Sequence, residues 1–78
     1  MTRLPSVSSR QIIAVLRAAG FKEAPDRGKG SHRAFCKTDP SDKVRLVIVP
    51  QGKDIPRGTL LAILDQAGLS RDEFLGLL

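Results

Sequence analysis

Two segments with helical hydrophobic periodicity enclose a central segment that alternates as β-strands do. In the first segment, apolar residues recur at the spacing of an amphipathic helix over positions 9–19. The second segment is a broad apolar stripe that runs from Leu60 to Ala67. This double change of period restricts the chain to folds in which helices pack on a sheet, the α+β class.

Capping signals mark the ends of these helices. Ser8-Ser9-Arg10-Gln11 and Ser70-Arg71-Asp72-Glu73 both have the pattern of a capping box, so the second of them predicts a short additional helix at the C-terminus. Gly20 and Gly68 stand where a left-handed residue would end the first and second helices. Asp54 is the predicted N-cap of the second helix.

The central segment predicts three antiparallel strands. Residues 32–37 alternate in polarity, residues 44–49 are β-branched and apolar, and the turn-forming residues 38–42 join them as a hairpin. Residues 21–26 are a weaker strand candidate at the sheet edge, because Pro25 cannot donate to a ladder. The order helix, three strands, helix predicts both helices on one face of the sheet, with the other face open.

The length of 78 residues predicts one domain over 1–78, with residues 1–7 as a flexible N-terminus. Cys36 is the only cysteine, which excludes an internal disulfide and fits a reducing cytosol. The N-terminus lacks the apolar run of a signal peptide, and no stretch approaches the roughly 18 apolar residues of a membrane span. We therefore expect a soluble, cytoplasmic protein that does not bind membranes.

Positive charge is concentrated in the middle of the chain. The formal net charge is +5, and all of it arises between positions 27 and 57. Such a concentration is typical of proteins that bind polyanions, nucleic acids among them. A solvated face that keeps the protein in solution would give the same count, so charge alone leaves both interpretations open.

The segment 27–32, Arg-Gly-Lys-Gly-Ser-His, combines several features of an anion site. Its two glycines free the backbone to present amides to a phosphate, and Arg27 and Lys29 add full charges. His32 is the only histidine, and imidazole is the side chain whose ordinary pKa suits proton transfer near neutral pH. Phe35 should face the helices, so His32, three residues away, should lie on the open face.

Ordinary structural roles could also explain these residues. A Gly-x-Gly segment between strands is usually only a turn, and a lone histidine is more often a surface residue than a catalyst. One imidazole without a suitably spaced acid cluster makes a metal site improbable, and no cofactor is expected.

Gly30-Ser31-His32-Arg33-Ala34-Phe35 resembles the Gly-Ser-His-x-x-Phe signature of HicA-type toxins. The segments 55–60, Ile-Pro-Arg-Gly-Thr-Leu, and 63–69, Ile-Leu-Asp-Gln-Ala-Gly-Leu, are similar to a second conserved pattern of these toxins. The resemblance covers about positions 8–74. It implies a double-stranded-RNA-binding-domain-like α-β-β-β-α fold, metal-free cleavage of mRNA, and silencing by a HicB-type antitoxin.

The motif histidine, here His32, is the active-site residue that this resemblance implies. The residues expected to bind RNA beside it are Arg27, Lys29, Gly30, Ser31 and Arg33. The chain departs from the family at Ala24-Pro25-Asp26, where relatives have an apolar first strand. It also departs after Pro50, where many relatives carry a second histidine and this chain has Gln51 and Gly52.

The mechanism that we expect uses the 2′-hydroxyl of RNA as the nucleophile. His32 would act as its general base, or as the acid for the leaving 5′-oxygen, while Arg27, Lys29 or Arg33 stabilises charge on the phosphate. The main alternative is a non-catalytic RNA-binding module of the same fold. A third possibility is an interaction protein whose open sheet binds an acidic partner. A monomer is favoured for the free toxin.

Overall fold

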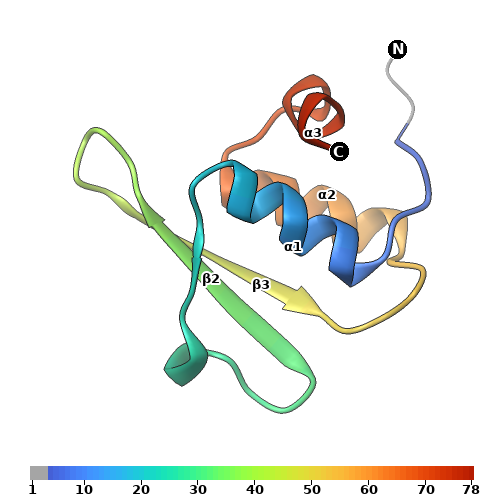
Figure 1. Cartoon of the computed structure of the whole chain (residues 1–78), viewed down its shortest axis with the longest axis horizontal. Coiled ribbons are helices and arrows are strands. Elements are labelled where there is room, and N and C mark those ends of the chain that lie inside the picture. The colour runs from blue at the N-terminus through green and yellow to red at the C-terminus, as the bar shows by residue number, and fades with distance from the viewer. Residues whose placement is uncertain (1–3) are drawn as a thin grey trace.

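The computed structural model describes residues 4–78, and it has the predicted α+β architecture (Figure 1). The helices α1 and α2 lie side by side on one face of a three-stranded sheet, and α3 packs against α1. This arrangement confirms the α-β-β-β-α order with a short additional C-terminal helix. In chain order the elements are α1 (Ser9–Ala18), β1 (Lys22–Glu23), the 3-10 helix η1 (Pro25–Arg27), β2 (His32–Thr38), β3 (Val44–Pro50), α2 (Arg57–Ala67) and α3 (Arg71–Leu77).

The sheet is antiparallel, with the strand order β1-β2-β3. The hairpin of β2 and β3 pairs His32 with Pro50 at one end and Thr38 with Val44 at the other. β1 contains only two residues, so the strand predicted over 21–26 was too long. The reason is Pro25, which has no N–H to donate to the ladder and instead begins η1.

The predicted ends of α1 and α2 are confirmed by their hydrogen bonds and dihedral angles. Ser8 Oγ accepts from the N–H of Gln11 at 3.2 Å, and the Ser8 N–H donates to Gln11 Oε1 at 2.9 Å, which completes a capping box. Gly20 and Gly68 follow the two helices with φ of 97° and 71°, the left-handed conformation that glycine adopts without strain.

The prediction for the start of α2 was wrong. Pro56 occupies the N-cap position, and no side chain in the described part of the chain caps the helix there. Asp54 instead accepts a hydrogen bond from the hydroxyl of Ser6. The start of α3 does follow its prediction, because Ser70 and Glu73 form the expected capping box.

The core lies between the two helices and the sheet. Phe35 and Val47, on the inner face of the hairpin, are fully buried there, as predicted for Phe35. Val7 is also buried, and its carbonyl accepts from the N–H of Ile55 at 2.9 Å. The expectation of a flexible segment over 1–7 is therefore corrected at Val7, which is part of the core, while residues 1–3 lie outside the described residues.

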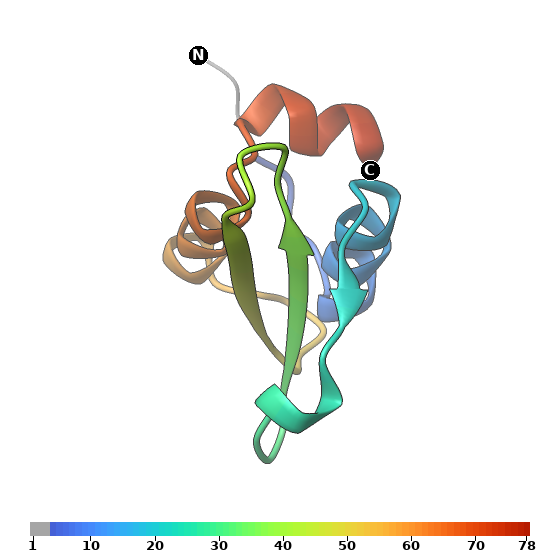
Figure 2. The same cartoon turned by 90° about the vertical axis from the view of Figure 1, so that its left-hand side faces the viewer.

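The sheet face without helices is only partly open. Figure 2 views this face, with η1 and the loop after it lying over the end at which β2 begins. Ala34, two residues after His32 on the same face, is fully buried there. Towards the other end, Val44 and Leu46 are 64% and 38% exposed, so the predicted open face is confirmed for that half alone.

Candidate active site

His32 is the first residue of β2 and is exposed at the end of the sheet. It faces a hollow of about 220 Å³ between the start of β2 and the segment that leads into it. The hollow is lined by Glu23, Pro25, Gly28, Lys29, Gly30, His32, Arg33 and Ala34. The structure thus gathers Lys29, Gly30, His32 and Arg33, four of the residues singled out from sequence.

A tight turn places Lys29 beside His32. The two residues exchange backbone hydrogen bonds, each 3.1 Å long, across the turn residues Gly30 and Ser31. Gly30 has φ of 61°, so the turn requires the freedom of glycine at this position. Residues directly opposite each other in an antiparallel pair have Cβ atoms about 4.5–5.5 Å apart on the same face. The Lys29 side chain therefore starts next to the imidazole.

Gly28 keeps this loop close against β2. A Cβ atom at this position would lie 3.0 Å from the carbonyl oxygen of His32 and 3.4 Å from the nitrogen of Ala34. Both of these are backbone atoms of a strand, so neither can move aside as a flexible side chain would. Gly28, the first glycine of the segment, thus has a packing role, in addition to the freedom that the sequence suggested.

Arg33 is held by an acidic residue that the sequence analysis did not identify. Its Nε and Nη2 donate to the two carboxylate oxygens of Glu23 at 2.9 and 2.7 Å. The hydrogen bond from Arg33 lowers the pKa of Glu23 below its usual value, and the same bond raises the pKa of Arg33. Arg17 lies 3.5 Å from Glu23, and the Arg17 and Arg33 guanidinium carbons lie 5.5 and 5.6 Å from the centre of the Phe35 ring.

Arg27 and Ser31 are exposed beside the hollow but do not line it. Neither Lys29 nor Arg27 forms an ion pair within residues 4–78, whereas the charge of Arg33 is partly neutralised by Glu23. Lys29 is therefore the cation best placed to meet an anion at His32, and Arg27 is available at the margin.

The basic segment 27–57 does not form a single surface. Lys37 Nζ donates to the carbonyl of Ala19 at 2.6 Å, at the C-terminal end of α1. Arg45 lies 3.8 Å from Asp39, near the turn that joins β2 to β3. These cations stabilise the fold far from His32, so only part of the charge counted in the sequence is available to a ligand.

The arrangement suits proton transfer beside a bound phosphate. An exposed imidazole lies next to a lysine, and the amides of Gly30 and Ser31 donate to no other residue within 4–78. Within the same residues, no three histidine, cysteine, aspartate or glutamate side chains are grouped so that they could hold a metal ion. No helix there has the length and apolar character needed to cross a membrane.

Comparison with known families gives a match over most of the chain. The model of a family described as "HicA toxin of bacterial toxin-antitoxin" matches residues 9–69, which include every element from α1 to α2 together with His32. No curated protein matches the chain.

Proposed function

The chain belongs to the HicA toxin family of bacterial toxin–antitoxin systems, whose members are ribonuclease-type toxins, and we propose that it cleaves mRNA by a metal-independent reaction that depends on His32. The observation that carries the proposal is the pairing of His32 with Lys29 at an exposed strand end. It brings together a proton acceptor, a cation and backbone amides, and the cation and the amides have no partner among residues 4–78.

The reaction starts from the 2′-hydroxyl of the RNA. His32 takes the hydroxyl proton, and the 2′-oxygen attacks the adjacent phosphorus. The bond from phosphorus to the 5′-oxygen breaks, that oxygen takes up a proton, and a 2′,3′-cyclic phosphate remains. Lys29 and the amides of Gly30 and Ser31 stabilise the charge that develops on the phosphate oxygens. The proton for the 5′-oxygen comes from His32 or from water.

The test is cleavage of a long single-stranded RNA in EDTA by the wild-type protein and by His32→Ala. We expect wild-type cleavage and a loss of about 10²–10⁴-fold in the variant, the usual contribution of a positioned base. Lys43→Gln is the matched control, because Lys43 is an exposed cation in the distant turn and its loss should leave cleavage unchanged. Circular dichroism spectra verify that all three proteins are folded.

A 2′-deoxy nucleotide at the scissile position should block cleavage, because it removes the nucleophile. Cleavage of this RNA at an undiminished rate would exclude the proposed chemistry. RNA binding without cleavage by either protein would instead support a non-catalytic RNA-binding module. Equal cleavage by wild type and His32→Ala would show that another residue is the catalyst.

Membership of a toxin–antitoxin family implies an antitoxin partner, and we infer that it binds the exposed half of the helix-free sheet face. Val44 and Leu46 are exposed on this face, so a protein bound there would bury apolar surface. His32 lies at the other end of the same strands, so the bound antitoxin would block RNA by extending along the sheet to that end. Strand addition at the β3 edge is less suitable, because the N–H of Ile48 already donates to Gln66 Oε1 at 3.1 Å.

Leu46→Asp tests this interface. We expect the variant to cleave RNA as the wild type does, but to escape inhibition by the antitoxin encoded with it. Unchanged inhibition of Leu46→Asp would place the antitoxin elsewhere.

A further inference from the structure

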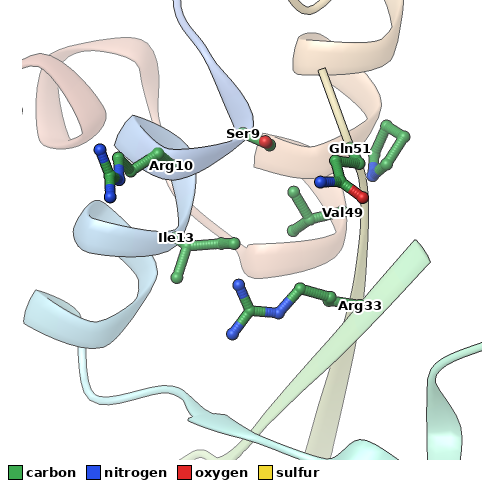
Figure 3. Close-up of a pocket in the computed structure, with 7 residues that line it drawn as sticks. Ser9, Arg10, Ile13, Arg33, Val49 and Gln51 are labelled. Atoms are coloured by element: carbon green, nitrogen blue, oxygen red, sulfur yellow. The ribbon is translucent and has the colours of Figure 1, made fainter. Parts of the chain in front are cut away.

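Three hollows that share lining residues follow one another around the end of the sheet that carries His32, and together they are called the groove here. The hollow beside His32 shares Arg33 with a cavity of about 280 Å³ between α1 and the end of β3. That cavity shares Arg10 and Gln51 with a third hollow, which extends to Lys53. Figure 3 shows the middle cavity, with Arg10 on α1 at one side and Gln51 and Arg33 at the other.

The far part of the groove is fixed by hydrogen bonds between α1 and the loop after β3. The N–H of Ser9 donates to the carbonyl of Gly52 at 2.9 Å, and the Ser9 hydroxyl donates to the same oxygen at 3.1 Å. Arg10 and Gln51, the immediate neighbours of these two residues, are therefore held on the two sides of one cavity.

The charged side chains that line the groove are mainly cations. They are spaced along its length, from Lys29 through Arg33 and Arg10 to Lys53. Glu23 is the only carboxylate among the residues that line the three hollows, and it is bonded to Arg33. The side chains of Arg10 and Lys53 form no ion pair or hydrogen bond within residues 4–78. Unneutralised cations at intervals along a groove suit a chain of phosphates.

The middle cavity has the composition of a site for one nucleotide. Ile13, Val49 and Pro50 supply apolar surface, and Arg10 and Gln51 supply polar groups. Small-ligand sites combine apolar walls with a few polar groups, and their volumes are usually about 300–1,000 Å³. The middle cavity, at about 280 Å³, is at the small end of this range, which favours a single base over a larger ligand. The Gln51 side chain has no hydrogen-bond partner within residues 4–78, and its amide offers both donors and an acceptor.

We propose that this groove binds the single-stranded RNA on one side of the scissile phosphate. Arg10 and Lys53 bind flanking phosphates, and Gln51 contacts a base that lies in the middle cavity. The proposal rests on the function proposed for His32, because it extends the same RNA beyond the cleaved bond. Base recognition here does not use aromatic stacking: the chain has no Trp or Tyr, and its three Phe are buried.

The first test measures RNA binding in a His32→Ala background, in which the RNA stays intact. The probe is a single-stranded oligonucleotide, and its affinity is measured over a range of salt concentrations. Arg10→Gln and Lys53→Gln should each weaken binding and reduce the log–log salt slope by about 0.7, the value for one phosphate contact on single strands. Lys43→Gln removes the same charge from the distant turn and should change neither quantity.

The outcomes separate this proposal from the proposed function. The groove proposal is refuted if Arg10→Gln and Lys53→Gln bind RNA with the same affinity as Lys43→Gln. A loss of affinity in Lys29→Gln would still support the site at His32. If Lys29→Gln also binds RNA with unchanged affinity, both the groove and the site at His32 are refuted. Normal RNA binding by Arg10→Gln combined with weaker capture of the antitoxin would make the groove a protein interface, which also refutes the proposal.

The second test concerns Gln51. Cleavage positions on a long RNA should be redistributed by Gln51→Ala, with a changed base preference at one nucleotide beside the cleaved bond. The melting temperature should stay at its wild-type value, because the side chain is exposed and makes no hydrogen bond within residues 4–78. An unchanged set of cleavage positions would refute base contact by Gln51.

Discussion

Gly28→Ala should damage the site by displacing the loop that carries Lys29. Gly28 has φ of −79° and ψ of 154°, an extended conformation that alanine adopts without strain. The added methyl group would meet the backbone of β2, at 3.0 Å from the carbonyl oxygen of His32. The strand is anchored by its pairing with β3, so the loop is the part that has to move.

The size of the effect follows from this contact. A Cβ atom at this separation requires the loop to move by a few tenths of an ångström. Such a shift strains the two 3.1 Å hydrogen bonds between Lys29 and His32, and overpacking of this kind costs about 1–3 kcal/mol. In a domain of this size each kcal/mol lowers the melting temperature by about 4–8 °C. A misplacement near 1 Å can reduce a rate by about 100-fold, so for this smaller shift we expect a loss of cleavage of about 10-fold.

The assay is single-turnover RNA cleavage at saturating protein, together with thermal unfolding followed by circular dichroism. Gly76→Ala is the control, because a Cβ atom at Gly76, inside α3, meets nothing within 4 Å. It should stabilise the fold by about 0.5–1 kcal/mol and leave cleavage unchanged. Wild-type cleavage and melting by Gly28→Ala would refute the close contact of the loop with β2. A lower melting temperature with undiminished cleavage would show that cleavage does not depend on the position of Lys29.

Two further substitutions test the cap of α1 and the acidic residue at the site. Ser8→Ala removes the oxygen that accepts from the Gln11 N–H and should cost about 1 kcal/mol, measured by urea unfolding; an unchanged midpoint would contradict the cap. The pKa of Glu23 lies below its usual value of 4.5, so its carboxylate stabilises the folded chain at higher pH and loses this contribution as the pH falls through the lowered value. In Glu23→Gln, the melting temperature should therefore fall less steeply as the pH is lowered. The variant should also bind RNA more tightly at low salt, because Arg33 is freed. An unchanged pH dependence and an unchanged affinity would refute this role.

Local signals made most of the fold predictable. The capping boxes and the glycines after α1 and α2 act over three or four residues, so the sequence predicts them without knowledge of the tertiary structure. The prediction failed where a distant residue decides the outcome. Asp54 has the chemistry of an N-cap, but it bonds to Ser6 from the opposite end of the chain while Pro56 takes the cap position. No pattern around Asp54 indicates that contact.

The candidate site was predictable in part for the same reason. His32, Lys29 and Gly30 are neighbours in sequence, so a motif could identify them together. Glu23 could not be found in this way, because its approach to Arg33 depends on the pairing of the two-residue strand β1 with β2. A glutamate in so short a strand gives no sequence signal of its own.

Charge counted along the sequence is a poor guide to the RNA-binding surface, because the fold brings distant segments together at one end of the sheet. Because β2 and β3 are antiparallel, the start of one and the end of the other coincide, and the bonds of Ser9 to Gly52 bring α1 to the same place. Arg10 joins the groove although it lies outside the basic segment 27–57. Lys37 belongs to that segment but binds the carbonyl of Ala19. Its replacement should therefore destabilise the end of α1 without weakening RNA binding, the opposite of the effect expected for Arg10.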